Sequence, residues 1–129
     1  MIRQNEDLEA QLDRLERHYE RLGDGTYLVS VGPGRPPIAM RLAPPVLVLR
    51  VNVGKLVKQG AADQARLFRR LLELNATDLL HASFGLEGSD IVLAAALELE
   101  TVDPREVEAA LADMDMALAE HVPTLRELV

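Results

Sequence analysis

The chain has 129 residues, a formal net charge of −7 and no cysteine. A chain of this length forms a single domain, residues 1–129, with a sizeable core, and the missing cysteines exclude a disulfide framework, thiolate metal ligation and a cysteine nucleophile. The acidic balance and the scarcity of aromatic residues, 3% of the chain, disfavour nucleic acid as a partner, because such surfaces combine clustered basic side chains with stacking platforms.

An amphipathic helix is predicted over residues 6–22, where apolar side chains recur at spacings of three and four. The glycines at positions 23 and 25 supply its stop, because glycine takes the left-handed C-terminal conformation without a side-chain penalty. Three strands are predicted next, over residues 26–31, 37–42 and 46–53, each bounded by glycine or proline. In the last of these strands one set of alternate residues faces the core, and the other set forms a mixed, partly exposed surface.

The second half of the chain begins with a helix over residues 61–74 that carries its leucines on one side. Two strands follow, over residues 80–86 and 91–99, joined by a polar turn. In the first strand the even-numbered residues from Leu80 to Leu86 share the core face. The second strand is apolar on both faces, which predicts a strand covered on two sides.

A last helix starts at Asp103-Pro-Arg-Glu106, where aspartate is the N-cap, proline takes the first helical position and glutamate follows three residues after the cap. Pro123 interrupts this helix, and Leu125 and Leu128 continue its apolar side in a final turn. The order of elements is α-β-β-β-α-β-β-α. The sequence therefore predicts an α+β fold in which an antiparallel sheet packs against helices.

Charge and hydropathy patterning constrain location and packing. Residues 25–86 carry eight basic side chains against three acidic ones, whereas residues 87–129 carry eleven acidic against two basic. Two explanations fit this division: complementary packing of acidic helices beside a basic sheet, or charged faces that are simply solvated. The N-terminus has no apolar signal core, and no run approaches the ~20 residues of a membrane span. We therefore expect a cytoplasmic protein without membrane insertion.

No catalytic, cofactor or metal site is predicted from the residues. The three histidines come from three different elements and lack metal-ligand spacing. Asp113 and Asp115 lie two apart on a helix, so they point in different directions and are expected to be solvated. An enzymatic or small-ligand site built from His81, Ser83 and a nearby carboxylate is an alternative, which requires these groups to converge in the fold.

Three segments of the chain carry a resemblance to a known family: Leu71-Leu-Glu-Leu-Asn75, then Phe84-Gly-Leu-Glu-Gly-Ser-Asp-Ile-Val-Leu93, then residues 103–111. With the order of elements, they make the whole chain resemble the type III secretion chaperone-like family, in its Tir-chaperone and YbjN-like branch. The resemblance implies a non-enzymatic homodimer that holds a polypeptide client against apolar grooves of the sheet and the first helix. It also allows a YbjN-like regulatory or scaffold module that binds a folded partner without holdase activity.

The same resemblance nominates interface residues. In the family the second helix and nearby strands commonly form the dimer contact, and the alternative for the helix positions is packing against the sheet of their own subunit. The dimer candidates implied are Leu67, Leu71, Leu74, Val92, Ala94 and Ala96. The client-binding candidates implied are Met40, Val46 and Val48, by strand addition along an edge or by binding in a groove. The alternative for each of these three residues is plain packing in the core.

Overall fold

The computed structural model describes residues 1–56, 60–123 and 125. The helices are α1 (Asn5–Arg14), α2 (Ala61–Thr77) and α3 (Pro104–Glu120). The strands are β1 (Tyr19–Arg21), β2 (Tyr27–Val29), β3 (Ile38–Ala43), β4 (Val46–Lys55), β5 (Ser83–Glu87) and β6 (Asp90–Glu98). Within the described ranges, no helix combines the length and the apolar character that crossing a membrane requires.

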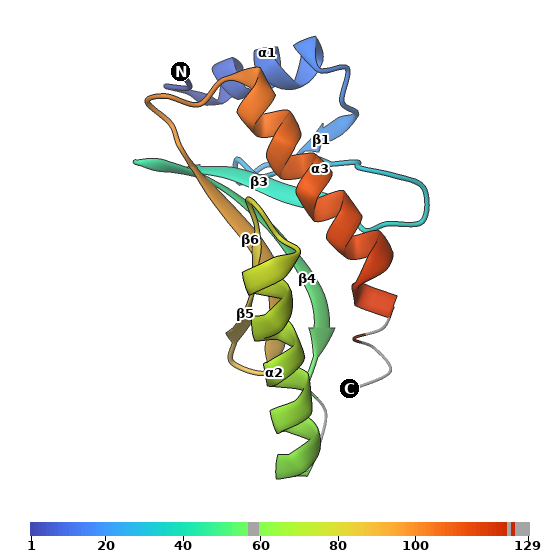
Figure 1. The fold of residues 1–129 in the computed structure, drawn as a ribbon. Coiled ribbons are helices and arrows are strands. Elements are labelled where there is room, and N and C mark those ends of the chain that lie inside the picture. Colours follow the sequence, from blue (N-terminus) through green and yellow to red (C-terminus); the bar gives the residue numbers. More distant parts are fainter. Residues whose placement is uncertain (57–59, 124, 126–129) are drawn as a thin grey trace.

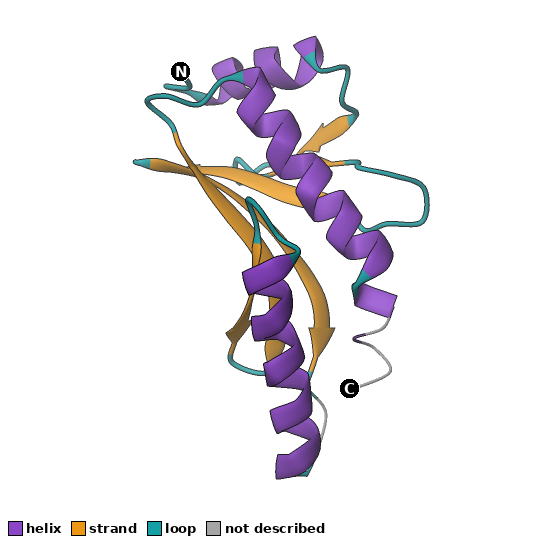
Figure 2. Cartoon of the chain, in the orientation of Figure 1, coloured by secondary structure: helices purple, strands orange, loops and turns teal. Residues whose placement is uncertain are grey.

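The described strands form one antiparallel sheet in the order β1-β2-β3-β4-β6-β5. The helices gather on one side of this sheet (Figures 1 and 2), with α2 packed on β5 and α3 packed on β6. The predicted α+β class, an antiparallel sheet packed against helices, is confirmed. The sheet has one more strand than predicted, because a strand replaces the second half of the first predicted helix.

The core fills the space between the sheet and the helices. Every second side chain of the central strand β4, from Leu47 to Val53, is buried there, with exposures of 6% or less. Met40 of β3 and Leu93 of β6 are fully buried on the same face. Burying an aliphatic side chain of this size contributes about 1.5–3 kcal/mol, so this alternation fixes which face of the sheet meets the helices.

Helix α1 ends at Arg14, eight residues before the predicted end at position 22. Glu16 takes a positive φ of 57°, in the left-handed region that non-glycine residues seldom adopt. The N–H of Arg17 then bonds to the carbonyl of Leu12 and turns the chain back. Because the left-handed residue is a glutamate and not a glycine, the sequence carries no stop signal at this point.

Strand β1 occupies the region where the helix was expected to continue. It pairs with β2, and Tyr19 packs edge-on against Tyr27 with ring centroids 5.7 Å apart. Gly25, with a φ of 87°, lies in the turn between β1 and β2 and does not end a helix. The prediction of one helix over residues 6–22 is wrong, because a short strand that packs Tyr19 on the sheet happens to continue the helical spacing of apolar residues.

Strand β5 starts at Ser83, three residues later than predicted. Ala82 and Phe84 are buried as expected, but Leu80 is 85% exposed and Leu86 is 46% exposed. Leu80 lies in the segment between α2 and β5, and the edge position of β5 leaves Leu86 beside solvent. The predicted single core face from Leu80 to Leu86 is therefore wrong at both of its ends.

Strand β6 also differs from its prediction. Its residues Ile91, Leu93 and Ala95 face the helices and are buried, whereas Ala96 on the opposite face is exposed. The helices cover one face of the sheet, so the predicted cover on both sides is absent at Ala96.

The start of α3 confirms its sequence signal. The Asp103 carboxylate accepts a hydrogen bond from the Glu106 N–H at 2.8 Å, with proline at the first helical position. Leu125 is 3% exposed and so lies on the apolar side as predicted, while Leu128 is outside the described residues.

Candidate protein-binding surfaces

The side of the sheet turned away from the helices is called here the helix-free face. Residues paired across strands share a face, and the register places Val48 opposite Ala96 and Arg50 opposite Ala94. The same logic extends the face from β2 to β5. Its residues are Leu28, Ala39, Arg41, Ala43, Val46, Val48, Arg50, Asn52, Lys55, Ser83, Gly85, Glu87, Asp90, Val92, Ala94, Ala96 and Glu98.

Four of the candidate interface residues lie in the core and not on a surface. Leu67, Leu71 and Leu74 of α2 are 0%, 5% and 1% exposed, and Met40 of β3 is fully buried. These side chains pack between α2 or α3 and the sheet of their own chain. They consequently offer almost no area to a second subunit or a client in this conformation.

The other candidates lie together on the helix-free face. Val46 and Val48 of β4 and Ala94 of β6 are partly exposed, Ala96 is exposed, and Val92 is buried. Because Val48 is directly opposite Ala96, Ala94 and Ala96, named for the dimer, lie beside Val46 and Val48, named for the client, on one surface.

Three exposed leucines were missed as interface candidates in the sequence. Leu72 of α2 is 68% exposed, Leu80 is 85% exposed and Leu86 of β5 is 46% exposed. All three belong to α2, to β5 or to the segment between them. The adjacent pair Leu71 and Leu72 held a signal, since two neighbouring positions of a helix cannot both face the same sheet.

The two edges of the sheet differ in how their backbone groups are used. On β5, the Asn75 side-chain amide donates to the Phe84 carbonyl at 3.0 Å and accepts from the Phe84 N–H at 2.7 Å. Asn75 thus takes the place of a neighbouring strand at Phe84 and blocks the edge at that residue.

On β1, the His18 carbonyl accepts from the Ser30 N–H and the Leu22 N–H donates to Thr26. Antiparallel alternation then turns the N–H and C=O groups of Tyr19 and Arg21 away from β2. In the described part of the chain these outward groups have no hydrogen-bond partner, so the β1 edge is open.

A polar cluster fastens α1 to the sheet beside this open edge. The Tyr27 hydroxyl donates to Glu9 Oε2 at 2.6 Å, and Arg21 Nη1 donates to the same oxygen at 2.8 Å. The Arg21 guanidinium also lies 5.6 Å from the centre of the Tyr27 ring, within range of a cation–π contact. Burial, followed by the hydrogen bond to Glu9, raises the pKa of Tyr27 to about 12.

Asp113 is a buried structural residue, contrary to the expectation that it is solvated. It is 8% exposed, and its carboxylate accepts the backbone N–H groups of Leu80, His81 and Ala82, with His81 N at 2.8 Å. These bonds hold the segment between α2 and β5 against α3. Asp115, on a different side of α3, forms an ion pair with Arg35 at 2.9 Å.

The alternative site at His81 and Ser83 does not assemble. Both side chains are exposed, and among the described residues no hydrogen bond joins the imidazole, the hydroxyl and a carboxylate. His121 is instead buried, with Nε2 3.3 Å from Asp78 Oδ2. The described ranges also hold no group of three side chains placed to ligate a metal ion.

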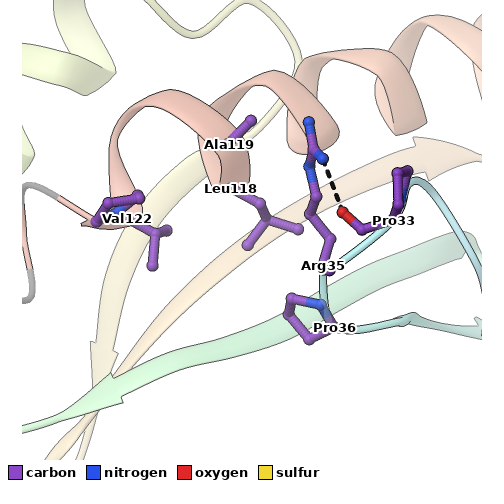
Figure 3. A pocket seen from close by; sticks show the side chains of 8 residues that line it. Pro33, Arg35, Pro36, Leu118, Ala119 and Val122 are labelled. Atoms are coloured by element: carbon purple, nitrogen blue, oxygen red, sulfur yellow. Dashed lines mark hydrogen bonds between the residues drawn. The ribbon is translucent and has the colours of Figure 1, made fainter.

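Several pockets open on the part of the surface that the structure describes. One, of about 380 Å³, lies between the β2–β3 loop and the end of α3, lined by Pro33, Arg35, Pro36, Leu118 and Val122 among others (Figure 3). There Arg35 Nη1 donates to the Pro33 carbonyl at 2.9 Å, while its Nε pairs with Asp115 of α3. Two others, of about 570 and 320 Å³, lie between α1 and α3 and beside β1 and β2. None of these three converges polar groups on one point, as an active site does.

Solved structures of other proteins share this fold. A search of the curated proteins finds no match. Among solved structures, a chain of the ExoU–SpcU heterodimer from the type III secretion system of Pseudomonas aeruginosa superposes with a TM-score of 0.69 at 14% identity, covering 90% of this chain and 95% of that one. YbjN from E. coli gives a TM-score of 0.67 at 14% identity, covering 93% and 92%. A chain of the HopA1–SchA chaperone–effector complex gives 0.59 at 16% identity, covering 93% and 90%.

At these identities the structural neighbours establish the fold alone. The family is established separately, because the CesT_Tir_1 model matches residues 1–129. This agrees with the resemblance to the Tir-chaperone and YbjN-like branch that the sequence carries. The chain belongs to the CesT_Tir_1 family.

Proposed function

We propose that this protein is a non-enzymatic chaperone or adaptor that works in the cytoplasm as a homodimer and binds a polypeptide client. The observation that carries the proposal is the helix-free face, where Val46, Val48, Ala94 and Ala96 leave apolar surface uncovered on the central strands. The membership of the CesT_Tir_1 family supports it, as do the folds of the ExoU–SpcU and HopA1–SchA complexes.

The client is assigned to the helix-free face and the adjoining β1 edge. An extended segment added to β1 would pair with the outward N–H and C=O groups of Tyr19 and Arg21. A further stretch of the same client would lie across the apolar residues of β4 and β6, which β2 and β3 separate from β1. Backbone pairing of this kind needs little sequence specificity. It therefore suits a chaperone that holds its client without folding it.

The dimer contact is assigned to the outer side of α2 and its surroundings. Leu67, Leu71 and Leu74 are occupied by the core, and Val92, Ala94 and Ala96 share their surface with the client candidates. The exposed Leu72, Leu80 and Leu86 are apolar side chains outside the helix-free face, on α2, on β5 and on the segment between them. A dimer through these leucines leaves the helix-free face of both subunits available to clients.

The dimer is tested by sedimentation equilibrium at micromolar concentration. The unsubstituted protein is expected to be a dimer, and Leu72→Glu to be a monomer, because a charge at the contact is left desolvated. Ala112→Glu, at an exposed position of α3, is the matched control and should remain dimeric. A monomeric unsubstituted protein would refute the dimer, and a dimeric Leu72→Glu would refute its placement on α2.

The client is tested by affinity purification from the native host followed by titration of the recovered partner. Val48→Glu is expected to lose the partner, whereas Ala119→Glu, exposed on α3, retains it. Equal binding by both variants would remove the helix-free face as the client surface. The absence of any recurrent partner would contradict the chaperone assignment itself.

A YbjN-like module that binds a folded partner without holdase activity is the second candidate. It is favoured by the superposition on YbjN, a candidate transcription regulator from E. coli, whose TM-score of 0.67 nearly equals that of the secretion-system complex. The two functions differ in the state of the partner. A holdase suppresses aggregation of the unfolded client, whereas the module binds one native partner stoichiometrically and leaves that aggregation unchanged.

A further inference from the structure

One residue of the helix-free face is more buried than its position explains. Val92 is 7% exposed, whereas Val46 and Val48 on the same face are partly exposed and no helix covers any of them. Its neighbour on β5 is Gly85, which has no side chain to shield it.

The neighbour of Val92 on β4 does not supply the cover either. Asn52 lies opposite Val92, but its amide oxygen accepts the Gly54 N–H at 3.2 Å. This bond holds the Asn52 side chain along its own strand. The cover must come from elsewhere on the face.

An ion pair crosses the sheet above this valine. Arg50 of β4 lies opposite Ala94, and Glu87 of β5 lies opposite Asp90. On β6, the strand between them, Val92 is midway between positions 94 and 90. Arg50 Nη2 pairs with the Glu87 carboxylate. The two side chains therefore reach toward each other diagonally over Val92, across two strand spacings of about 4.8 Å each and four residues along β6.

We propose that Arg50 and Glu87 form a displaceable cover over Val92, which shortens the apolar strip of the helix-free face until a client arrives. The proposal rests on the assignment of this face to the client. The two side chains are 41% and 53% exposed, and ion pairs so exposed contribute little net stability and are screened by salt. An incoming apolar segment displaces them, and Val92 then joins Ala94 and Ala96 in one continuous strip.

The cover is tested by the reactivity of a single thiol. Since the chain has no cysteine, Val92→Cys introduces a unique site whose labelling by uncharged iodoacetamide reports its exposure. The rate is expected to rise several-fold when either Arg50→Gln or Glu87→Gln is added, and in high salt. Arg41→Gln is the charge control, because Arg41 lies on the same face but on β3, opposite Val48. This change should leave the labelling rate unchanged.

The two cover variants also separate exposure from thiol acidity. Removing Arg50 and removing Glu87 change the local charge in opposite directions, so an effect on the thiolate alone moves the two rates in opposite directions. Loss of the cover over residue 92, by contrast, raises the labelling rate in both variants. Opposite movements, or no change in either rate, would overturn the proposal.

A second measurement avoids the cysteine altogether. In methyl-labelled protein with a soluble gadolinium chelate, the paramagnetic relaxation of the Val92 methyls should rise to the level of the Val48 methyls on Arg50→Gln. An unchanged Val92 value refutes the cover. Neither the labelling rate nor the methyl relaxation needs a client or a dimer. If both measurements show no cover over Val92, the proposed function is unaffected. If no client is found, the change in Val92 exposure can still be measured.

Discussion

Asp113→Asn tests whether one buried carboxylate holds the segment between α2 and β5 against α3. The carboxylate accepts three backbone N–H groups and is 8% exposed. All three N–H groups reach the same oxygen, Oδ2. Asparagine can place its amide oxygen at that position, so it keeps the three bonds but removes the negative charge that strengthens them. Because hydrogen bonds to a charged acceptor are stronger than neutral ones by about 1 kcal/mol each, and only the Ala82 donor is buried, the expected loss is about 1–2 kcal/mol.

The loss is measured by urea unfolding followed by far-ultraviolet circular dichroism. Asp115→Asn is the matched control, two residues along the same helix, where the carboxylate is 30% exposed and pairs with Arg35. That change should cost about 0–1 kcal/mol, as expected for a surface ion pair. Amide exchange of residues 80–82 should accelerate in Asp113→Asn and not in the control. Equal losses in the two variants would refute the role given to Asp113.

Three further predictions follow from the core and the edges of the sheet. Asn75→Ala should lower the free energy of unfolding by about 1–3 kcal/mol and cause concentration-dependent self-association in light scattering, since it frees the β5 edge at Phe84. Because folding holds Tyr27 protonated up to about pH 12 while the unfolded chain ionises near 10.0, stability in urea should fall as pH rises through that window, and less steeply in Tyr27→Phe. Leu67→Ala should cost about 2–5 kcal/mol in thermal unfolding of the monomer, against about 0.5 or less for Leu72→Ala.

Most of the elements were predictable because their signals are local. The alternation in β4 and the cap at Asp103 follow from backbone geometry within a few residues, and both agree with the structure. The first helix was predicted to be too long, because the residue that ends it in the left-handed conformation is Glu16 and not a glycine. Beyond Glu16, Tyr19 fits the apolar spacing of a continued helix as well as it fits a short strand. The sequence pattern therefore cannot distinguish the two.

The candidate surfaces were predictable only in part. Strand alternation identified Val46 and Val48 as partly exposed, and the structure places them there. The same reasoning could not decide which leucines of α2 meet the sheet, because adjacent leucines at 71 and 72 both satisfy an apolar pattern. Only the docking of α2 on β5 buries Leu71 and exposes Leu72.

The class of fold, the antiparallel sheet and the family resemblance could be derived from the sequence, because they depend on the period and the order of apolar segments. The tertiary structure decided which face of the sheet stays uncovered, which edge stays open and what Asp113 does. Those properties arise from contacts between distant segments, such as the 32 residues that separate His81 from Asp113. Periodicity shows which side chains prefer burial, but the packing of the helices determines which of them obtain it.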